Sequence, residues 1–294
     1  MSDSRQEAGT RSRQDRGVLA GHMARAQRAL VTALRAVDVV WEVADARCPR
    51  ASRNPRLAHL CAGKPMVVLL AKSDLAEPTV TGAWLAYLGR AGIAIAMDLR
   101  NGFDPAVLRR ASLGAAARSG ARVVADRLSA MAAGVPNTGK STLLNRVSGG
   151  AHVAVGARPG VTRGEQWLRL PGGGRVLDLP GVLPPRLPAW PVVWRLWAVG
   201  ALSLDAGDAQ RAGAALVEWV AARAPGLLPQ RYGVDPEEAL AGRGLLAIAR
   251  RRGFLLQGGA VDETRAAEAL VADYRKGVLG RVTLEDPPVE GSGV

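Results

Sequence analysis

The sequence predicts an α/β protein with a mostly parallel sheet, followed by a smaller all-helical C-terminal domain. Three observations predict this fold class. Strand patterns alternate with helical patterns over residues 18–186, which is typical of a parallel sheet. A phosphate-binding loop at residues 134–142 lies within that alternation. After a proline-rich segment at residues 184–188, tryptophans recur at helical spacing and helical patterns follow.

The individual elements follow from periodicity and turn residues. Residues 1–17 are polar and basic without an apolar period, so we expect a disordered tail. An amphipathic helix follows, with Leu30, Leu34 and Val37 on one face. Short aliphatic runs predict strands over residues 39–43, 65–70, 93–97, 128–133, 166–170 and 175–179. Helices are predicted near residues 80–89 and 105–117, after residue 139, and over 190–204, 207–223, 236–252 and 262–276.

Two of these predictions need a further argument. Residues 128–133 lack β-branched side chains, and we assign them as a strand because the phosphate loop after them requires one. The stripe of Trp190, Trp194 and Trp197 is more often part of a core than a platform for stacking bases. Residues 187–294 are expected to form a separate all-helical domain, and we expect that domain to contact RNA or the ribosome.

The charge of the chain favours a polyanionic partner. The 294 residues carry a net charge of +13 and a pI near 11.1, although a generally arginine-rich composition is the alternative explanation. Residues 1–186 hold 27 lysines and arginines against 13 acidic residues, whereas residues 187–294 hold 12 against 13. We therefore expect nucleic-acid contacts to include the first part of the chain.

Cysteine usage and hydropathy indicate the compartment. Only Cys48 and Cys61 occur, which excludes a disulfide framework, and neither has a partner at zinc spacing. No apolar run reaches about 18 residues and no signal segment opens the chain. We expect a soluble, cytoplasmic protein without a membrane partner.

Residues 134–142 fit the phosphate-loop pattern of two glycines five residues apart, followed by Lys and Ser. The glycines allow successive backbone N–H groups to turn inward around a polyphosphate. Lys140 supplies a positive charge for the β- and γ-phosphates, and the Ser141 hydroxyl can bind Mg²⁺. A glycine-rich loop before a helix, without a nucleotide, is the alternative. The residues expected to bind the nucleotide are Asn137, Thr138, Gly139, Lys140, Ser141 and Thr142.

Three further segments match the nucleotide-contacting loops of GTPases. Asp178 ends a strand, where it can hold Mg²⁺ through water, and the N–H of Gly181 can meet the γ-phosphate. Thr162 is placed to supply the switch hydroxyl that closes on Mg²⁺. Lys72-Ser73-Asp74 resembles the Asn-Lys-x-Asp base reader, whose carboxylate accepts two hydrogen bonds from guanine. Because adenine has no donor at N1, Asp74 favours GTP over ATP.

The order of these segments is unusual, because here the base reader precedes the phosphate loop, whereas it follows the loop in an ordinary GTPase. We therefore predict a circularly permuted P-loop GTPase domain over residues 18–186, with an unchanged site in three dimensions. Such a domain ends just after residues 178–181, which lead directly into the helical domain. GTP hydrolysis could then re-orient that domain through residues 184–188.

The chain resembles the YlqF/RbgA family of circularly permuted ribosome-assembly GTPases over about residues 18–290. The likeness rests on several short motifs: Gly21-His22-Met23-Ala24, Asp45-Ala46-Arg47, Ser52-Arg53-Asn54-Pro55, residues 134–142, Arg158-Pro159-Gly160-Val161-Thr162, residues 178–181, Arg231-Tyr232-Gly233 and Arg252-Gly253. The resemblance implies maturation of the large ribosomal subunit, with GTP hydrolysis stimulated on the precursor particle.

The resemblance also implies roles for single residues. Family members carry an apolar residue, here Val182, where other GTPases have a catalytic glutamine, and His22 matches the histidine proposed to orient water instead. Capping of the first helix is the alternative role of His22. Asn137 matches an asparagine thought to help bind K⁺. The expected catalytic set is therefore His22, Lys140 and Thr162, and the expected Mg²⁺ ligands are Ser141, Thr162 and Asp178.

Two positions depart from the family pattern. Ala71 stands where the base-reading asparagine is expected, which removes one hydrogen bond worth roughly 0.5–1.5 kcal/mol. The loop near residues 98–100 lacks the usual Ser-Ala that would present an N–H to guanine O6. Both departures lower the expected affinity for GTP without changing the expected fold.

Three functions are compatible with these patterns. The first is a GTPase with a low intrinsic rate that binds rRNA and the large-subunit precursor and leaves after hydrolysis; we expect it to be monomeric off the ribosome and not to bind DNA. The second is an RNA-binding assembly module that binds nucleotide weakly or does not hydrolyse it, which Ala71 favours. The third, an ATP-using P-loop enzyme, is disfavoured by Asp74.

Overall fold

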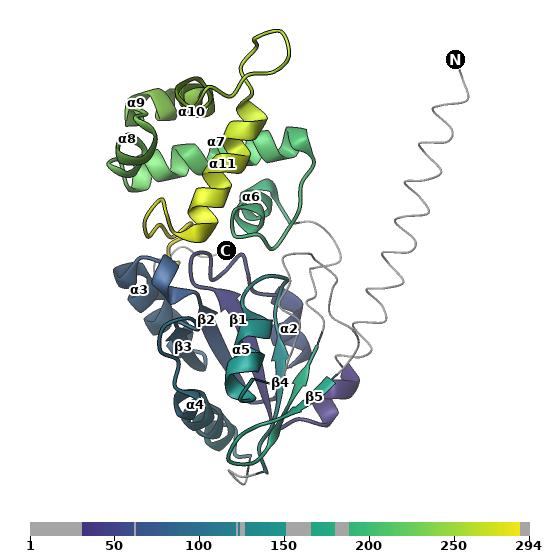
Figure 1. Ribbon diagram of the computed structural model, residues 1–294. Helices are drawn as coiled ribbons and strands as arrows, with labels where there is room; N and C mark the ends of the chain where they lie inside the picture. Colours follow the sequence, from purple (N-terminus) through teal and green to yellow (C-terminus); the bar gives the residue numbers. More distant parts are fainter. Residues whose placement is uncertain are drawn as a thin grey trace, which may run out of the picture.

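The computed structural model describes residues 31–61, 63–121, 123, 127–150, 166–179 and 188–288 (Figure 1). A six-stranded sheet with helices on both faces forms an α/β part, and the helices from α6 onward form a helical part above it (Figure 1). The predicted fold class, a mostly parallel α/β sheet followed by helices, is confirmed.

The sheet has the spatial order β3-β2-β1-β4-β6-β5. Its strands are β1 (Val39–Asp45), β2 (Met66–Ala71), β3 (Ile93–Met97), β4 (Ser129–Ala133), β5 (Gln166–Arg169) and β6 (Arg175–Asp178). All neighbours run parallel except β5 and β6. β2 precedes the base-reading segment and β4 precedes the phosphate loop. Both strands pair in parallel with β1, so their carboxyl ends lie close together at the same end of the sheet.

Alternation along β1 explains how the sheet is covered. Val39, Trp41 and Val43 pack on one face with side chains of α4 (Pro105–Arg118) and α5 (Lys140–Val147). Val40 faces the other way, toward the helical turns of residues 31–35 and α2 (Pro55–Leu60). Ala44 lies on that same face beside α3 (Pro78–Gly89). A strand buried on both faces reads as a continuous apolar run, which is the pattern of β2. In β1 the buried Glu42 interrupts this pattern and pairs with Arg53.

The helical part is built around α7 (Ala206–Arg223), which packs against α6 (Trp190–Ala198) and α11 (Glu263–Lys276). α7 and α11 approach each other so closely at Gly213 that a Cβ there would overlap the Ala267 side chain. Trp194 and Trp197 are buried in this core, as predicted for the tryptophan stripe. Shorter elements complete it: α8 (Leu227–Tyr232), α9 (Pro236–Glu238), the π-helix η3 (Ala239–Arg243) and α10 (Gly244–Arg252).

Two predicted helices differ from the structure. The helix predicted over residues 190–204 ends at Ala198, because Gly200 has a φ of +84° that a right-handed helix cannot continue. The helix predicted over residues 236–252 is divided at Gly242, whose φ is +76°. The short helices α2 and α8 were not predicted, since six residues are too few to show a clear helical period.

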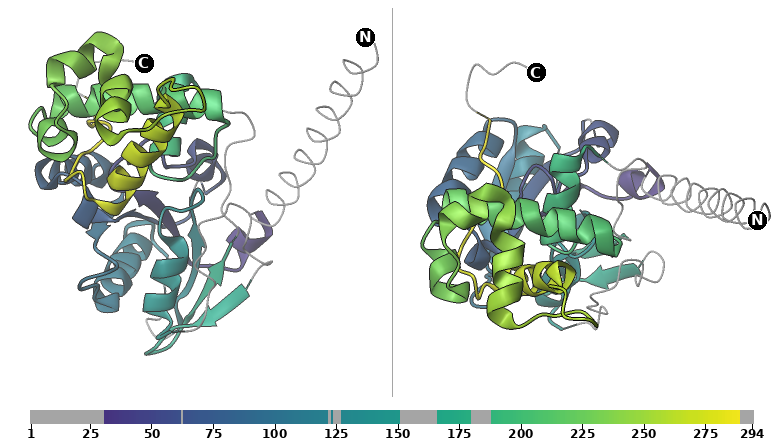
Figure 2. Two further views of the ribbon diagram at one scale, coloured as in Figure 1. Left: turned by 45° about the horizontal axis from the view of Figure 1, so that its top comes forward. Right: turned by 90° about the horizontal axis from the view of Figure 1, so that it is seen from above.

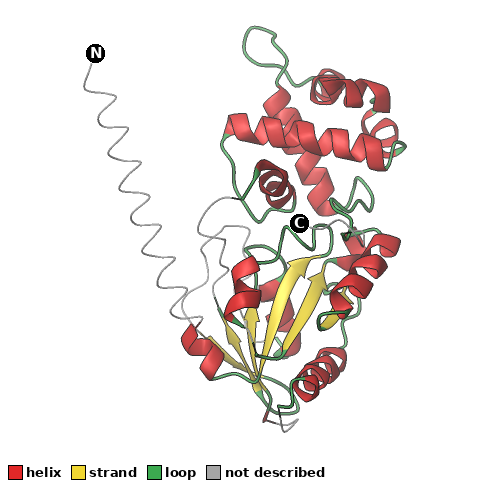
Figure 3. Ribbon diagram, turned by 180° about the vertical axis from the view of Figure 1, so that it is seen from behind, coloured by secondary structure: helices red, strands yellow, loops and turns green. Residues whose placement is uncertain are grey.

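The segment after α11 joins the two parts of the molecule. The N–H of Leu284 donates to the carbonyl of Arg47, at 2.6 Å, in the loop after β1. From the other side, Arg195 Nε donates to the carbonyl of Leu284 at 2.8 Å and Trp219 Nε1 to that of Thr283 at 3.0 Å. The helical part therefore lies across the end of the sheet where β1 and β4 finish, as seen from above and from behind (Figures 2 and 3). No helix in the described ranges is long and apolar enough to cross a membrane.

Candidate nucleotide site

The phosphate loop joins β4 to α5, as the sequence predicted. Gly139 has a φ of +108° at the start of α5, a conformation that only glycine adopts without strain. Gly134 is needed for a different reason, because a Cβ there would overlap the carbonyl oxygen of Val43 in β1. The Thr138 hydroxyl donates to the carbonyl of Val135 at 3.0 Å and closes the turn. The weak strand propensity of residues 129–133 is overridden because β4 is buried between β1 and β6.

Lys140 and Asp178, the charges expected to act on phosphate and Mg²⁺, form a buried ion pair. Asp178 comes to this position because β6 pairs in parallel with β4, with Ala132 opposite Asp178. Ser141 is the next residue of α5 after Lys140. The hydroxyl and carboxylate oxygens of Ser141 and Asp178 are the hard ligands that Mg²⁺ prefers, so this donor set fits the metal. Within the described ranges, no group of three or more His, Cys, Asp or Glu residues could hold a metal.

The base-reading segment lies directly beside the phosphate loop. Lys72 adopts a left-handed conformation (φ 59°), and its Nζ donates to the carbonyl of Asn137 at 2.6 Å. Ala71 is buried, and its Cβ lies 3.3 Å from the position of a Cβ on Gly139. Asp74 lies in the 3₁₀ turn η1 (Ser73–Leu75), half-buried and without a hydrogen bond or ion pair to the described residues. Its carboxylate is therefore available to accept from a ligand.

The loop after β3 completes the base side of the site. Leu99 is buried, with its Cδ1 3.5 Å from the position of a Cβ on Gly139. Arg146 of α5 donates to the carbonyls of Leu99 (3.0 Å) and Arg100 (2.9 Å) and fixes this loop to the helix of the phosphate loop. Asp98 accepts the N–H groups of Arg100 (2.8 Å) and Asn101 (3.1 Å). Partial burial acts to raise the pKa of Asp98, but these hydrogen bonds outweigh it and lower the pKa.

Asp45, at the end of β1, holds the base reader in place. Its carboxylate accepts from Arg47 through Nε (2.9 Å) and Nη2 (2.8 Å), and from Lys72 Nζ (2.8 Å). Burial acts to raise the pKa of Asp45, but the charges of Arg47 and Lys72 dominate and keep the pKa well below its usual range. Arg47 is 1% exposed and also donates to the carbonyl of Tyr274 in α11, at 3.4 Å. This network connects the base reader to the helical part.

The helical part also contacts the phosphate loop itself. Asn137 Nδ2 donates to the carbonyl of Gly200, just after α6, at 2.6 Å. Val135 is buried in the same apolar cluster as Trp197 and Leu216. Neither this contact nor the Asp45–Lys72 pair could be predicted from the sequence, because neither follows from local periodicity. The Asp45-Ala46-Arg47 motif, noted for its family resemblance, was the sequence signal at the network that joins the base reader to the helical part.

The structure brings together most of the predicted site residues. Those within its described ranges lie just after β2, in the loop after β4, in the first turn of α5 and at the end of β6: Lys72, Ser73, Asp74, Asn137, Thr138, Gly139, Lys140, Ser141, Thr142 and Asp178. His22, Thr162 and Gly181 lie outside the described residues, as does the tail of residues 1–17.

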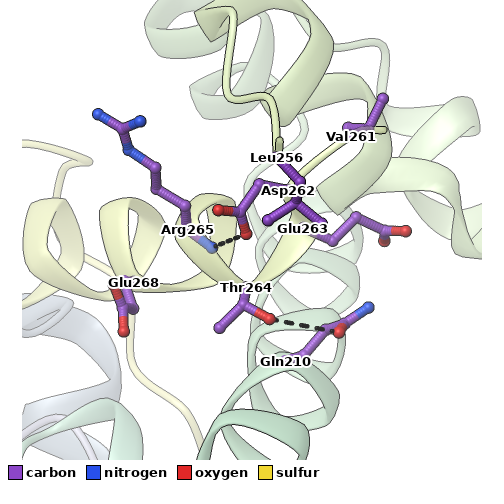
Figure 4. Close-up of a pocket in the computed structure, with 8 residues that line it drawn as sticks. All are labelled: Gln210, Leu256, Val261, Asp262, Glu263, Thr264, Arg265 and Glu268. Atoms are coloured by element: carbon purple, nitrogen blue, oxygen red, sulfur yellow. Dashed lines mark hydrogen bonds between the residues drawn. The ribbon is translucent and has the colours of Figure 1, made fainter. Parts of the chain in front are cut away.

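A separate pocket lies in the helical part, between the start of α11 and α7 (Figure 4). Its lining is mixed and mainly acidic or polar: Gln210, Leu256, Val261, Asp262, Glu263, Thr264, Arg265 and Glu268. The Thr264 hydroxyl and the Gln210 side chain hydrogen-bond across it at 3.5 Å, and the Asp262 carboxylate caps α11 (Figure 4). Three carboxylates repel a polyphosphate, so this pocket is not the candidate nucleotide site.

A phosphate loop whose base reader comes earlier in the chain, directly after a neighbouring strand of the same sheet, defines a circularly permuted P-loop GTPase. A family model described as "50S ribosome-binding GTPase" matches residues 129–204. Among curated proteins, Ribosome biogenesis GTPase A of Priestia megaterium is 35% identical over 276 residues, covering 91% of this chain and 95% of that protein. The protein of the same name from Thermotoga maritima is 31% identical over 268 residues, covering 91% and 93%. The chain therefore belongs to the ribosome biogenesis GTPase A family of GTP-hydrolysing enzymes, also called YlqF or RbgA.

Solved structures agree with this assignment. GNP-bound YlqF from Thermotoga maritima aligns with a TM-score of 0.62 and 26% identity, covering 89% of this chain and 98% of that one. A GDP-bound YlqF aligns with a TM-score of 0.57, covering 86% and 96%. Both structures were therefore solved with a nucleotide on a fold that this chain shares over most of its length.

Proposed function

We propose that the protein is a GTPase that acts in late assembly of the large ribosomal subunit, binds rRNA on the precursor particle and leaves after hydrolysis. The observation that carries the proposal is the contact between the two nucleotide-reading loops. Lys72 of the base reader donates to the carbonyl of Asn137 in the phosphate loop at 2.6 Å. Two residues 65 positions apart, in segments of permuted order, are thus in contact, which is the arrangement that a guanine-nucleotide site requires.

The proposed roles follow from the chemistry of each side chain. Lys140 stabilises the β- and γ-phosphate charge, and Asp74 accepts hydrogen bonds from guanine. Mg²⁺ would be held by Ser141, Thr162 and, through water, Asp178, and would neutralise phosphate charge. Asn137 would contribute to a K⁺ site, and His22 would orient the attacking water. The N–H of Gly181 would contact the γ-phosphate.

The partner proposed from charge is an RNA. The sheet-containing first part of the chain, residues 18–186 with its basic tail, has an excess of positive charge, whereas the helical domain of residues 187–294 is near neutral. Phosphate contacts from the first part should make binding to rRNA strongly dependent on salt. Raising salt from about 50 to about 200 mM should weaken binding by orders of magnitude. A flat response would show that the basic residues do not bind phosphate.

The proposed activity is tested by GTP turnover with and without purified large-subunit precursors, first in K⁺ and then in Na⁺. We expect slow turnover by the protein alone, stimulation by the precursor, and a lower rate in Na⁺. Mature large subunits provide the matched control and should stimulate less. If the precursor has no effect in either salt, the proposed role in assembly is wrong.

The base reader is tested by titrating fluorescent GTP and ATP into the wild type and Asp74→Ala. The wild type should prefer GTP, and the variant should lose that preference because guanine then lacks its acceptor. Glu268→Ala, which removes a carboxylate of the separate pocket in the helical part, serves as the control and should retain the preference. An unchanged preference in Asp74→Ala would exclude this carboxylate as the reader.

A non-hydrolysing RNA-binding module is the second candidate. It is favoured by Ala71 at the end of β2 and by Asp98, which already occupies two N–H groups of the loop after β3. The same turnover experiment separates it, because it predicts particle binding without phosphate release.

A further inference from the structure

The phosphate loop contacts the helical part at a point that is separate from the chain segment linking the two. The Asn137 side chain donates to the carbonyl of Gly200 at 2.6 Å. Gly200 lies two residues after the end of α6 and has a φ of +84°, so its carbonyl direction depends on the conformation of this turn. Whatever fixes that turn therefore also orients the Asn137 amide.

Arg275, near the end of α11, is the side chain that fixes this turn. Its Nε donates to the carbonyl of Ala198 at 3.1 Å, and its Nη2 donates to the carbonyl of Trp197. Its Nε also lies 3.4 Å from the position of a Cβ on Gly200, so the guanidinium packs directly against the turn. A cation at the carboxyl end of a helix is stabilised by the exposed carbonyls and the helix dipole.

The environment of Arg275 indicates a positional role. Its guanidinium is partly buried and, within the described ranges, forms no ion pair with a carboxylate. Burial lowers its pKa, and the nearby charge of Arg47 lowers it further. Keeping a charge here is unfavourable by itself, and the contacts that compensate are carbonyls of the turn that carries Gly200.

We propose that Arg275 is a positioning residue for the nucleotide site. It holds the turn after α6 so that the carbonyl of Gly200 orients Asn137 in the phosphate loop. The proposal rests on the proposed function, because it assumes that this loop binds a guanine nucleotide. The preceding residue, Tyr274, accepts a hydrogen bond from Arg47 at 3.4 Å, so one turn of α11 is coupled to both the phosphate side and the base side of the site.

Two-way coupling follows from these contacts. If two positions of α11 differ in nucleotide affinity by some factor, then bound nucleotide must shift the equilibrium between those positions by the same factor. An RNA or protein that displaces the helical part would thereby alter nucleotide binding without touching the site.

The test measures the affinity of the full-length protein for N-methylanthraniloyl-GDP in the wild type, Arg275→Met and Arg275→Lys. Losing these charge-assisted hydrogen bonds should weaken binding by about tenfold in Arg275→Met, and Arg275→Lys should recover part of it. The matched control is Arg223→Met, which removes another arginine that links the two parts, through Glu77 and Asp286, away from the phosphate loop. Its affinity should stay within twofold of the wild type.

A double-mutant cycle separates positioning from general destabilisation. Asn137→Ala and Arg275→Met should be strongly non-additive in nucleotide affinity, because both interrupt the same connection. Additive losses, or an Arg223→Met loss equal to that of Arg275→Met, would overturn the proposal. If Arg275→Met fails to fold, Gly200→Ala displaces the same turn, and unchanged affinity in that variant would overturn it as well. Failure of the wild type to bind the probe would instead refute the proposed function.

Discussion

The buried carboxylate of Asp45 gives the most direct test of how the two parts of the molecule are joined. Asp45 is fully buried and neutralises Arg47, which is 1% exposed, together with Lys72. Asp45→Ala would leave the Arg47 guanidinium buried with a carbonyl and an aromatic ring as its remaining contacts. Removing one partner of a buried ion pair costs about 3–5 kcal/mol.

An exposed pair in the same interface provides the comparison. Arg223 makes a bidentate pair with Asp286, whose side chain is 51% exposed, at 2.8 Å for both bonds. Because water screens that pair, Asp286→Ala should cost at most about 1 kcal/mol. Both arginine–carboxylate pairs are bidentate, but Asp45 is buried and also pairs with Lys72, whereas Arg223 keeps Glu77 as a partner when Asp286 is lost.

The assay is urea unfolding of the wild type, Asp45→Ala and Asp286→Ala at several pH values. The folded pKa of Asp45 is lowered, so its contribution is complete above its unfolded pKa of about 4 and is lost as pH falls through the folded value. The difference between wild type and Asp45→Ala should therefore persist at pH 5 and shrink only in strong acid. Equal losses in the two variants, or a difference that vanishes between pH 7 and 5, would refute the reasoning.

Three further predictions concern single sites. Burial raises the pKa of Glu285, and two backbone N–H groups and nearby arginines offset this only in part, so the stability that Glu285 contributes is lost as pH rises. Glu285→Gln should therefore raise the melting temperature at pH 8 and not at pH 4. A lower melting temperature at pH 8 would contradict this. Ala71→Asn should tighten GTP binding by a few-fold to about tenfold in a fluorescence titration, because the asparagine would restore one hydrogen bond to the base. Unchanged or weaker binding would mean that the base-site alignment is wrong. Gly134→Ala should lower the free energy of unfolding, measured in urea, by about 1–3 kcal/mol, because the new Cβ would overlap a β1 carbonyl. Gly82→Ala in α3, where a Cβ meets open space, should be neutral or stabilising. Equal effects of the two substitutions would contradict the packing argument.

Much of the site could be predicted because its signals are local. The phosphate loop and Lys72-Ser73-Asp74 each follow a strand, and Asp178 is the last residue of one. Short patterns of this kind are set by turn geometry and strand burial. Their order along the chain was enough to predict a permuted sheet, and β2 and β4 do pair with β1 on either side. Even β4, whose alanines have little strand propensity, was placed by the requirements of the loop after it.

The sequence by itself therefore determined the fold class and the family resemblance, and it supplied the candidate nucleotide-contacting loops. Only the tertiary structure decided how those loops are connected to the helical part. The contacts of Asn137 with Gly200 and of Arg47 with Tyr274 join residues 63 and 227 positions apart, and neither has a periodic signature. Such contacts depend on how two separately formed layers pack, and local propensity carries no information about that packing.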